Sequence, residues 1–215
     1  MHTLLVLSGP IIYFLQAFMA VFGIYMAILL SRKIGQKKFK SAAAAGEFMD
    51  EVKTNLDQQD FDSLASLCDS PPYWAKATPQ MILIALAHRD RGFSKLRDLL
   101  GEKFDRDIMA ELQYQHSWIG TVAKTAPMLG LLGTVTGMIL AFEKISTASA
   151  AGGLDPGTLA QEIAIALNTT AIGLTVAIPM TVIGSWVQLQ IAKMADNVQE
   201  QLGEFLHDLQ RAMVS

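Results

Sequence analysis

Three long stretches of the chain contain no charged side chain, and they dominate its pattern of apolar and polar positions. They cover residues 3–31, 125–142 and 163–192. A helix crosses a bilayer with ~20 mainly apolar residues, and at ~1.5 Å per residue the third stretch would reach ~45 Å, beyond the ~30 Å hydrocarbon core. We therefore predict three transmembrane helices, the third of which continues as helix outside the membrane.

The composition favours this interpretation over the alternative, that the three stretches are buried helices of a soluble protein. Of the 215 residues, 51% are hydrophobic and 17% are charged, and the mean hydropathy is +0.32. Soluble domains carry ~25% charged residues. No segment shows the alternation of apolar and polar residues that is typical of strands, so the predicted fold class is an all-α integral membrane protein.

The remaining segments are more polar, and their apolar residues recur at helical spacing. Phe48, Val52 and Leu56 predict one helix, and Thr78 before Pro79 resembles an N-cap followed by proline at the first helical position. Two further apolar faces predict long helices continuous with the second and third spans. The first comprises Phe104, Ile108, Leu112, Gln115, Ile119 and Val122, and the second comprises Met194, Val198, Leu202, Phe205, Leu209 and Met213.

Basic residues set the expected orientation. Five of them lie between Arg32 and Lys40, just after the first charge-free stretch, whereas no Lys or Arg precedes it. Short segments rich in Lys and Arg stay on the cytoplasmic side. We therefore expect a periplasmic N-terminus, an uncleaved signal-anchor as the first span, and a cytoplasmic C-terminus. On this topology Lys144 is the only basic residue outside, and the basic cluster at 32–40 contacts anionic lipid headgroups.

This topology divides the chain into six predicted parts. They are the external N-terminus with the first span over 1–31, a cytoplasmic helical domain over 32–118, the second span over 119–143, a short periplasmic loop over 144–158, the third span over 159–190 and a cytoplasmic C-terminal helix over 191–215. In the loop, either Asp155 before Pro156 or Thr158 with Gln161 offers an N-cap for the third span. Cys68, the one cysteine, excludes an internal disulfide and falls on the reducing side.

Small residues recur at spacings of three and four in the second and third spans, although glycine weakens a helix by ~1 kcal/mol relative to alanine. In lipid, helices associate through close backbone approach and polar contacts. One stripe comprises Ala126, Gly130, Gly133, Gly137 and Ala141, and the other comprises Ala166, Thr170, Gly173, Ala177, Thr181 and Gly184. We predict close packing along both stripes, with Pro127 and Pro179 allowing bends. By themselves the stripes indicate packing and do not establish transport.

Two segments, TAPMLGLLGTVTGMILAF from residue 125 and ALNTTAIGLTVAIP from residue 166, carry a more specific signal. Taken together, they resemble the MotA/TolQ/ExbB proton-channel family, and most closely its ExbB and TolQ branch. Their AP-x-LGLLGTV-x-G and TTA-x-GL-x-VAIP elements have the family's order and separation, and the topology agrees over nearly the whole chain. The resemblance implies a homo-oligomer in the bacterial inner membrane, pentameric in this family, around a dimeric ExbD- or TolR-like partner with one membrane helix.

The resemblance also implies a function. Ion flow through such an assembly drives envelope energy transduction or transport, with a membrane aspartate of the partner as proton carrier, and a TonB- or TolA-like protein is a candidate further partner. The alternative is a non-conducting oligomeric membrane scaffold. We do not expect an enzyme, because the histidines are scattered and no nucleophile or metal-binding spacing occurs. The sequence indicates neither a cofactor nor nucleic-acid binding.

Candidate site residues follow from the same resemblance. Thr134 matches the threonine of GTV-x-G and Thr170 that of TTA-x-GL, so both hydroxyls would face the pore; alternatively, each bonds to its own helix. Family members often carry glutamate where this chain has Ile165. Glu162, about one turn earlier on a similar face, would act as an entrance carboxylate or mark the aqueous end of the span. Asn168 would add a pore contact or an interhelical hydrogen bond.

Overall fold

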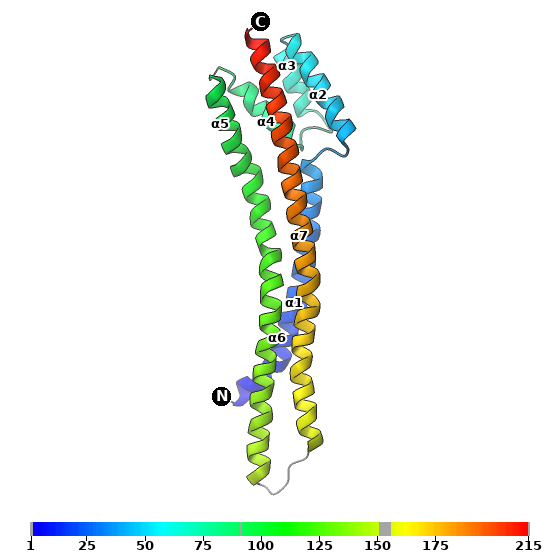
Figure 1. Ribbon diagram of the computed structural model, residues 1–215, viewed down its shortest axis with the longest axis vertical. Coiled ribbons are helices and arrows are strands. Elements are labelled where there is room, and N and C mark those ends of the chain that lie inside the picture. The colour runs from blue at the N-terminus through cyan, green and yellow to red at the C-terminus, as the bar shows by residue number, and fades with distance from the viewer. Residues whose placement is uncertain (1, 91, 151–155, 215) are drawn as a thin grey trace. The chain divides into compact units, whose positions relative to one another are not determined.

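The computed structural model describes the backbone of residues 2–90, 92–150 and 156–214, and among these residues it contains helices and no strand. Figure 1 labels the helical elements. They are α1 (His2–Lys37), α2 (Ala42–Asp57), α3 (Phe61–Asp69), α4 (Ala77–Ala87), α5 (Phe93–Phe104), the π-helix η1 (Asp105–Met109), α6 (Ala110–Ala150) and α7 (Pro156–Val214). The predicted all-α fold class is confirmed.

Three helical regions are long and apolar enough to cross a membrane, as the charge-free stretches predict. One lies near the N-terminus, one within Phe93–Ser146 and one within Leu159–Met213, and their most apolar windows have mean hydropathies of 2.1, 1.6 and 1.7. α7 continues without interruption from the third span to Val214, so the predicted helical extension past the membrane is also confirmed. The chain is therefore a multi-pass membrane protein.

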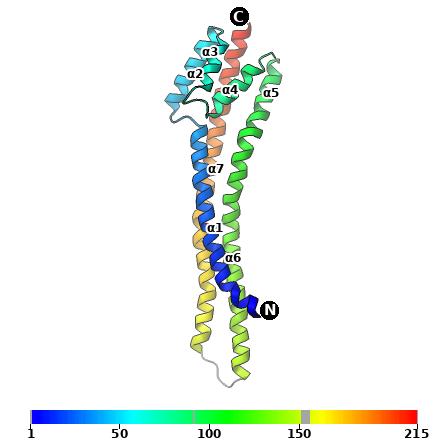
Figure 2. The ribbon, with the colours of Figure 1, turned by 180° about the vertical axis from the view of Figure 1, so that it is seen from behind.

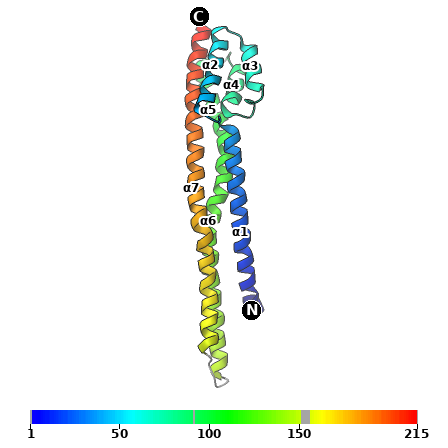
Figure 3. The same cartoon turned by 90° about the vertical axis from the view of Figure 1, so that its right-hand side faces the viewer.

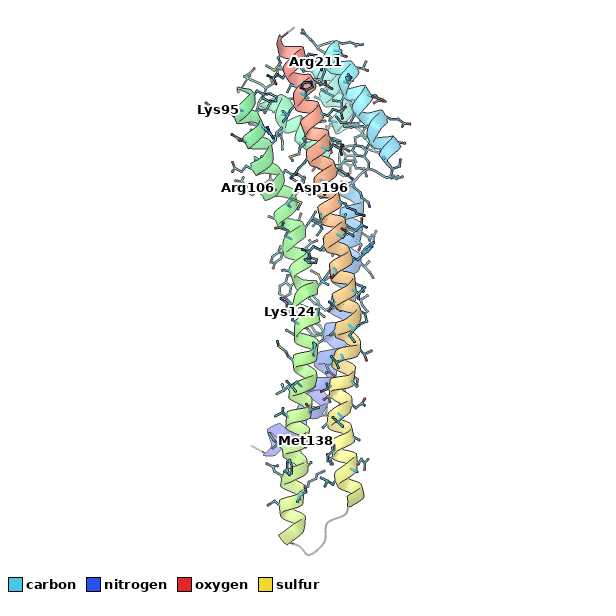
Figure 4. All side chains as sticks on the ribbon, viewed as in Figure 1. Lys95, Arg106, Lys124, Met138, Asp196 and Arg211 are labelled. Atoms are coloured by element: carbon cyan, nitrogen blue, oxygen red, sulfur yellow. The ribbon has the colours of Figure 1, made fainter. Side chains whose placement is uncertain are left out.

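The chain forms two compact units, and each is described by itself. We call residues 1–28 and 116–186 the span unit, because it holds most of the charge-free stretches, and residues 29–115 and 187–215 the head unit. Figure 4 labels Lys95, Arg106, Asp196 and Arg211 among the many charged side chains of the head unit. It also labels Met138, which lies in the charge-free stretch of α6 in the span unit.

In the span unit, parts of α1, α6 and α7 run side by side, as Figures 1 and 2 show from opposite directions. Many of their large apolar side chains point outward, including Phe14, which is 73% exposed, and Val21 at 69%. Only 28%, 22% and 28% of the residues in the three spanning windows are buried inside the chain. Continuous apolar surface of this kind marks contact with lipid or with other protein chains.

In the head unit, short helices gather beside the C-terminal part of α7 (Figure 3). α2 packs on α3, α3 on α4, and α4 on α5. The core consists of large side chains, and Phe48 and Phe205 are fully buried. The Phe48 ring lies 5.3 Å from that of Phe39 and 4.7 Å from that of Tyr73, centroid to centroid, within the range of favourable aromatic contacts.

Side chains close the N-terminal ends of two of these short helices. Ser41 Oγ accepts a hydrogen bond from the Ala44 amide at 3.2 Å, and Asp60 Oδ1 accepts one from the Ser63 amide at 3.0 Å. The hydrogen bonds from Ser63 favour the charged carboxylate and so lower the pKa of Asp60. These caps satisfy amides that would otherwise lack a partner at the helix ends.

The N-cap predicted at Thr78 is wrong. α4 begins at Ala77, and Lys76 occupies the N-cap position without a side-chain cap. Thr78 is 1% exposed, and its hydroxyl donates to Gln201 Oε1 of α7 instead. A buried hydroxyl needs a partner, and here the packing of α4 against α7 supplies one that sequence spacing along α4 does not reveal.

The predicted apolar faces are buried, with one exception. Phe48, Val52 and Leu56 are at most 1% exposed, and the apolar members of the face from Phe104 to Val122 are at most 4% exposed. The last predicted face is buried through Leu209, whereas Met213 is 53% exposed.

Because α6 extends to Ala150 and α7 begins at Pro156, helix enters both ends of the loop predicted over 144–158. The two N-cap candidates, at Asp155 and at the Thr158 side chain, lie outside the described residues.

The basic cluster after the first span makes several polar contacts inside the head unit. Lys33 pairs with Glu111, Lys37 Nζ donates to Gln80 Oε1 at 2.8 Å, and Lys76 Nζ donates to the Lys38 carbonyl at 2.8 Å. Burial lowers the pKa of Lys37, with Glu111 opposing this shift and Lys33 adding to it. The end of α1 is thereby attached to the helices that follow it in sequence.

Candidate functional site

Glycines of α6 and α7 allow the two helices to approach backbone to backbone inside the span unit. A Cβ added at Gly130 would lie 2.8 Å from Thr170 Cα, and one at Gly173 would lie 2.6 Å from the Ala126 carbonyl oxygen. Both neighbours are backbone atoms, which cannot rotate away. At Gly137 an added Cβ would lie 2.6 Å from Ala166 Cβ. The contact therefore requires glycine, in the manner of small-residue interfaces in membranes.

Thr169 fills the space next to Gly133, where an added Cβ would lie 2.7 Å from the threonine Cβ. The residue is 3% exposed, and its hydroxyl lies 3.1 Å from the Gly130 carbonyl of α6 and 2.7 Å from the Ala166 carbonyl of its own helix. One hydroxyl thus joins α6 to α7 while remaining bonded to α7. Interhelical hydrogen bonds of this kind contribute ~1 kcal/mol in membranes.

The two threonines predicted to line a pore lie in different surroundings. Thr134 is partly exposed, and its hydroxyl donates to the Leu131 carbonyl of its own helix at 2.7 Å. Thr170 has its Cα against Gly130, and its hydroxyl oxygen is buried without a hydrogen-bond partner among the described residues. Most other hydroxyls of these spans are satisfied as Thr134 is, for example Thr175, which donates to the Ala171 carbonyl at 2.8 Å.

The remaining polar candidates lie closer to the end of the span. Glu162 forms an ion pair with Lys144, which joins the beginning of α7 to the later part of α6. The side chain of Asn168 is exposed on the surface of the span unit, and Ile165 is 48% exposed. The ion pair gives Glu162 a partner of opposite charge at the end of the charge-free stretch. No group of three metal-binding side chains occurs within the described residues.

Pro127, Pro179 and Ala177 are further residues predicted to bend or pack the second and third spans. Pro127 lies inside α6 and Pro179 inside α7, and both helices continue through them, so the bends proposed at these positions stay a prediction. Ala177 is 5% exposed, and its carbonyl accepts the Thr181 hydroxyl at 2.8 Å. This hydrogen bond lies within α7 and does not join it to another helix.

Sequence reasoning missed two residues at the meeting point of the three helices. Gln16 of α1 is 1% exposed, and its Nε2 donates to the Thr169 carbonyl at 2.8 Å. Thr169 also belongs to the TTA-x-GL element, but the resemblance implies a pore role for Thr170 alone. Gln16 is the only amide side chain in the first charge-free stretch, and that isolation is the signal that could have identified it, since polar side chains inside membrane spans are costly and tend to have a role.

Comparisons with known proteins agree with this architecture. The profile of the MotA/TolQ/ExbB proton channel family matches residues 77–200. An ExbB-like biopolymer transport protein of Helicobacter pylori is 38% identical over 69 residues, which are 32% of this chain and 44% of that protein. An ExbB homolog of Methanothermobacter thermautotrophicus is 28% identical over 170 residues, 78% of this chain and 56% of that protein. The chain thus spans about half the length of these relatives.

A solved structure shows the same fold. The structure of C. jejuni MotAB covers 96% of this chain and 77% of its own matching chain, with a TM-score of 0.57 and 17% sequence identity. At this identity the likeness concerns the fold alone. The family profile covers more than half of the chain and includes both helices whose glycines form the contact described above. With these glycines and threonines inside the matched region, the chain belongs to the MotA/TolQ/ExbB proton channel family.

Proposed function

We propose that this protein is the ring-forming subunit of a proton-driven motor in the bacterial inner membrane. It assembles as a homo-oligomer, a pentamer by analogy with its family, around a dimeric ExbD- or TolR-like partner with one membrane helix. Ion flow between the ring and the partner is coupled to envelope energy transduction or transport, and a TonB- or TolA-like protein receives the work. The N-terminus lies in the periplasm and the C-terminus in the cytoplasm.

The observation that carries this proposal is the Thr170 hydroxyl, which lies in the middle of apolar helices and has no hydrogen-bond partner among the described residues. Burying a hydroxyl without a partner costs about 1–3 kcal/mol. Because this oxygen is covered in the single chain, we expect it to gain a partner from another chain or from water when the helices around it separate in the assembly. The charge-free stretches contain no carboxylate. A proton carrier must therefore come from another chain, as the membrane aspartate of the proposed partner would.

The polar residues take different parts in this mechanism. Thr134 and Thr170 hydrogen-bond to water or to the partner's carboxyl group as its protonation changes, and Asn168 adds a polar contact from the exposed side of α7. Glu162, paired with Lys144, marks the aqueous end of the span and is not a proton relay. The glycines of α6 and α7 fix the helices that present these groups.

The test is proton flux into liposomes that contain the protein with its single-span partner, with the assembled complex measured in parallel. Thr134→Val combined with Thr170→Val keeps volume and β-branching but removes both hydroxyls. We expect flux to fall at least about tenfold while assembly persists, because a lost neutral hydrogen bond costs only ~1 kcal/mol. Glu162→Gln should reduce flux less than the double variant does.

Thr175→Val is the matched control, because Thr175 lies on the same helix as Thr170 but stands at a variable position of the TTA-x-GL-x-VAIP element, and its hydroxyl donates to the Ala171 carbonyl. It should conduct like the parent. If the double variant conducts like Thr175→Val, the pore assignment is wrong. If the parent with its partner bound passes neither H⁺ nor Na⁺, the protein is the non-conducting scaffold.

A further inference from the structure

Gln16 places the only amide of the first charge-free stretch at the contact between α1 and α7. The side chain is 1% exposed, and its Nε2 lies 2.8 Å from the Thr169 carbonyl, 153 residues away in sequence. That carbonyl belongs to the peptide bond that joins Thr169 to Thr170. The amide of α1 therefore contacts the backbone immediately before the proposed pore threonine.

Gly173 makes room for this contact. A Cβ at that position would lie 3.3 Å from Gln16 Nε2 and 3.3 Å from Gly130 Cα. Any side chain there would push against both α1 and α6. The glycine that allows α6 to approach α7 thus also admits the amide of α1, and the three helices meet at one point around Thr169 and Thr170.

If packing were its only role, glutamine at this position would make the protein less stable than an apolar side chain would. Its Oε1 is buried without a hydrogen-bond partner among the described residues, and so is Thr170 Oγ1. Unsatisfied buried polar atoms lower stability, and an apolar side chain of similar length would fill the same space without that loss. The side chain thus supplies a donor to the Thr169 carbonyl at the expense of an unsatisfied acceptor, which points to a requirement for that bond.

We propose that Gln16 is a positioning residue for ion conduction: its amide holds the Thr169 carbonyl and thereby fixes the orientation of α7 that presents the Thr170 hydroxyl to the ion path. This inference rests on the proposed function. α1 then contributes to conduction without reaching the ion path itself. Misplacement of a reacting group by ~1 Å can reduce a rate about a hundredfold, so a contact at the adjacent peptide is close enough to matter.

Two substitutions separate the hydrogen bond from the volume of the side chain. Gln16→Met keeps length and loses the donor, and it should reduce proton flux at least about tenfold at every pH. In Gln16→Glu, a protonated carboxyl group can still donate to the Thr169 carbonyl, whereas the ionised form cannot. Flux relative to the parent should therefore be close to normal at acidic pH and should decline as pH rises. Apart from Tyr13 and Tyr25, the three surrounding charge-free stretches carry no titratable side chain.

Tyr13→Phe is the matched control. Tyr13 of α1 donates to the Ile165 carbonyl of α7 at 3.3 Å, about one turn from Gln16 and away from Thr170. This variant also loses an α1–α7 hydrogen bond, yet it should conduct like the parent. Equal losses in Tyr13→Phe and Gln16→Met would mean that α1 is merely loosened, and the inference would be overturned.

The outcomes distinguish this inference from the proposed function. If the parent conducts and the double threonine variant does not, but Gln16→Met conducts normally, only the role of Gln16 is refuted. If Gln16→Met does not assemble, the pH profile of Gln16→Glu decides, and a flat profile refutes the inference. A parent that conducts no ion with its partner bound refutes the proposed function instead.

Discussion

The span unit and the head unit are both bundles of helices, but opposite kinds of residue hold them together. In the span unit the closest contacts involve glycine, and the largest side chains, such as Phe14, point away from the chain. In the head unit the largest side chains, such as Phe48, fill the centre, and Gly101 and Gly203 have no atom of another part of the chain within 4 Å of an added Cβ.

This difference follows from the solvent around each unit. Water drives large apolar side chains together, at roughly 25 cal/mol per Å² of buried apolar surface. Lipid provides no such force, so close backbone approach and polar contacts must supply the attraction. The same glycine or phenylalanine therefore has a different structural meaning in each unit, and substitutions can test this directly.

Phe48→Ala should have the largest effect. The side chain is fully buried in the head unit and lies against the rings of Phe39 and Tyr73, so its removal should destabilise this unit by about 3–5 kcal/mol. Phe14→Ala, the same change at a 73% exposed position in the span unit, should alter stability by less than ~0.5 kcal/mol. Thermal unfolding of the full chain in detergent measures both, and equal shifts would contradict the comparison.

Gly133→Leu should have the next largest effect. Even a Cβ at this position would overlap Thr169, so the variant should lose about 1–3 kcal/mol through overpacking and weaken the hydrogen bond from Thr169 to α6. The expected result is a marked loss of oligomer in a native mass measurement.

Two glycine controls sharpen this result. Gly120→Leu lies on the same helix within the span unit, and Gly101→Leu lies in the head unit. Apart from the backbone of its own helix and its chain neighbours, neither position has an atom within 4 Å of an added Cβ. Both variants should assemble like the parent, and a loss of oligomer in Gly120→Leu equal to that of Gly133→Leu would refute the importance of the close contact.

Cys68 should be nearly inert to thiol reagents, an effect on reactivity rather than on stability. The thiol is fully buried, and burial raises its pKa to about 12. Because the thiolate is the reactive form, alkylation of the intact protein at pH 8 should be far slower than that of a free cysteine and should increase only as the pH rises toward 12. Rapid labelling at pH 8 without denaturant would contradict the burial of this residue.

The same chemistry can place the two units relative to the membrane. In a Cys68→Ala background, Ser66→Cys reports on an exposed position of the head unit and Gly157→Cys on an exposed position at the beginning of α7. With the outer membrane permeable to an impermeant reagent, Gly157→Cys should react in whole cells and Ser66→Cys only after lysis. The reverse pattern would overturn the proposed orientation.

The sequence predicts most of the fold because periodicity along one helix depends on local spacing. The apolar faces around Phe48, Phe104 and Leu202 are buried as their spacing predicts. What spacing could not reveal are contacts between distant segments. The bond from Gln16 to Thr169 joins residues 153 positions apart, and Thr78 bonds to Gln201 rather than capping its own helix. Both side chains are polar and buried, and their partners depend on how the helices pack.

The π-helix at Asp105–Met109 lies between α5 and α6 and affects how far one helix is rotated about its axis relative to the other. Phe104, Ile108 and Leu112 follow one another at intervals of four, which on an α-helix would carry Leu112 ~80° away from Phe104. The wider turn of a π-helix takes up this drift, and all three side chains are buried. Removing one residue from this segment would leave seven α-helical steps, ~700°, between Phe104 and Leu112, within ~20° of two full turns. The π-helix therefore absorbs one extra residue of chain length without rotating α5 against α6, whereas a regular α-helix of the full length would turn Leu100 and Phe104 ~80° away from the core.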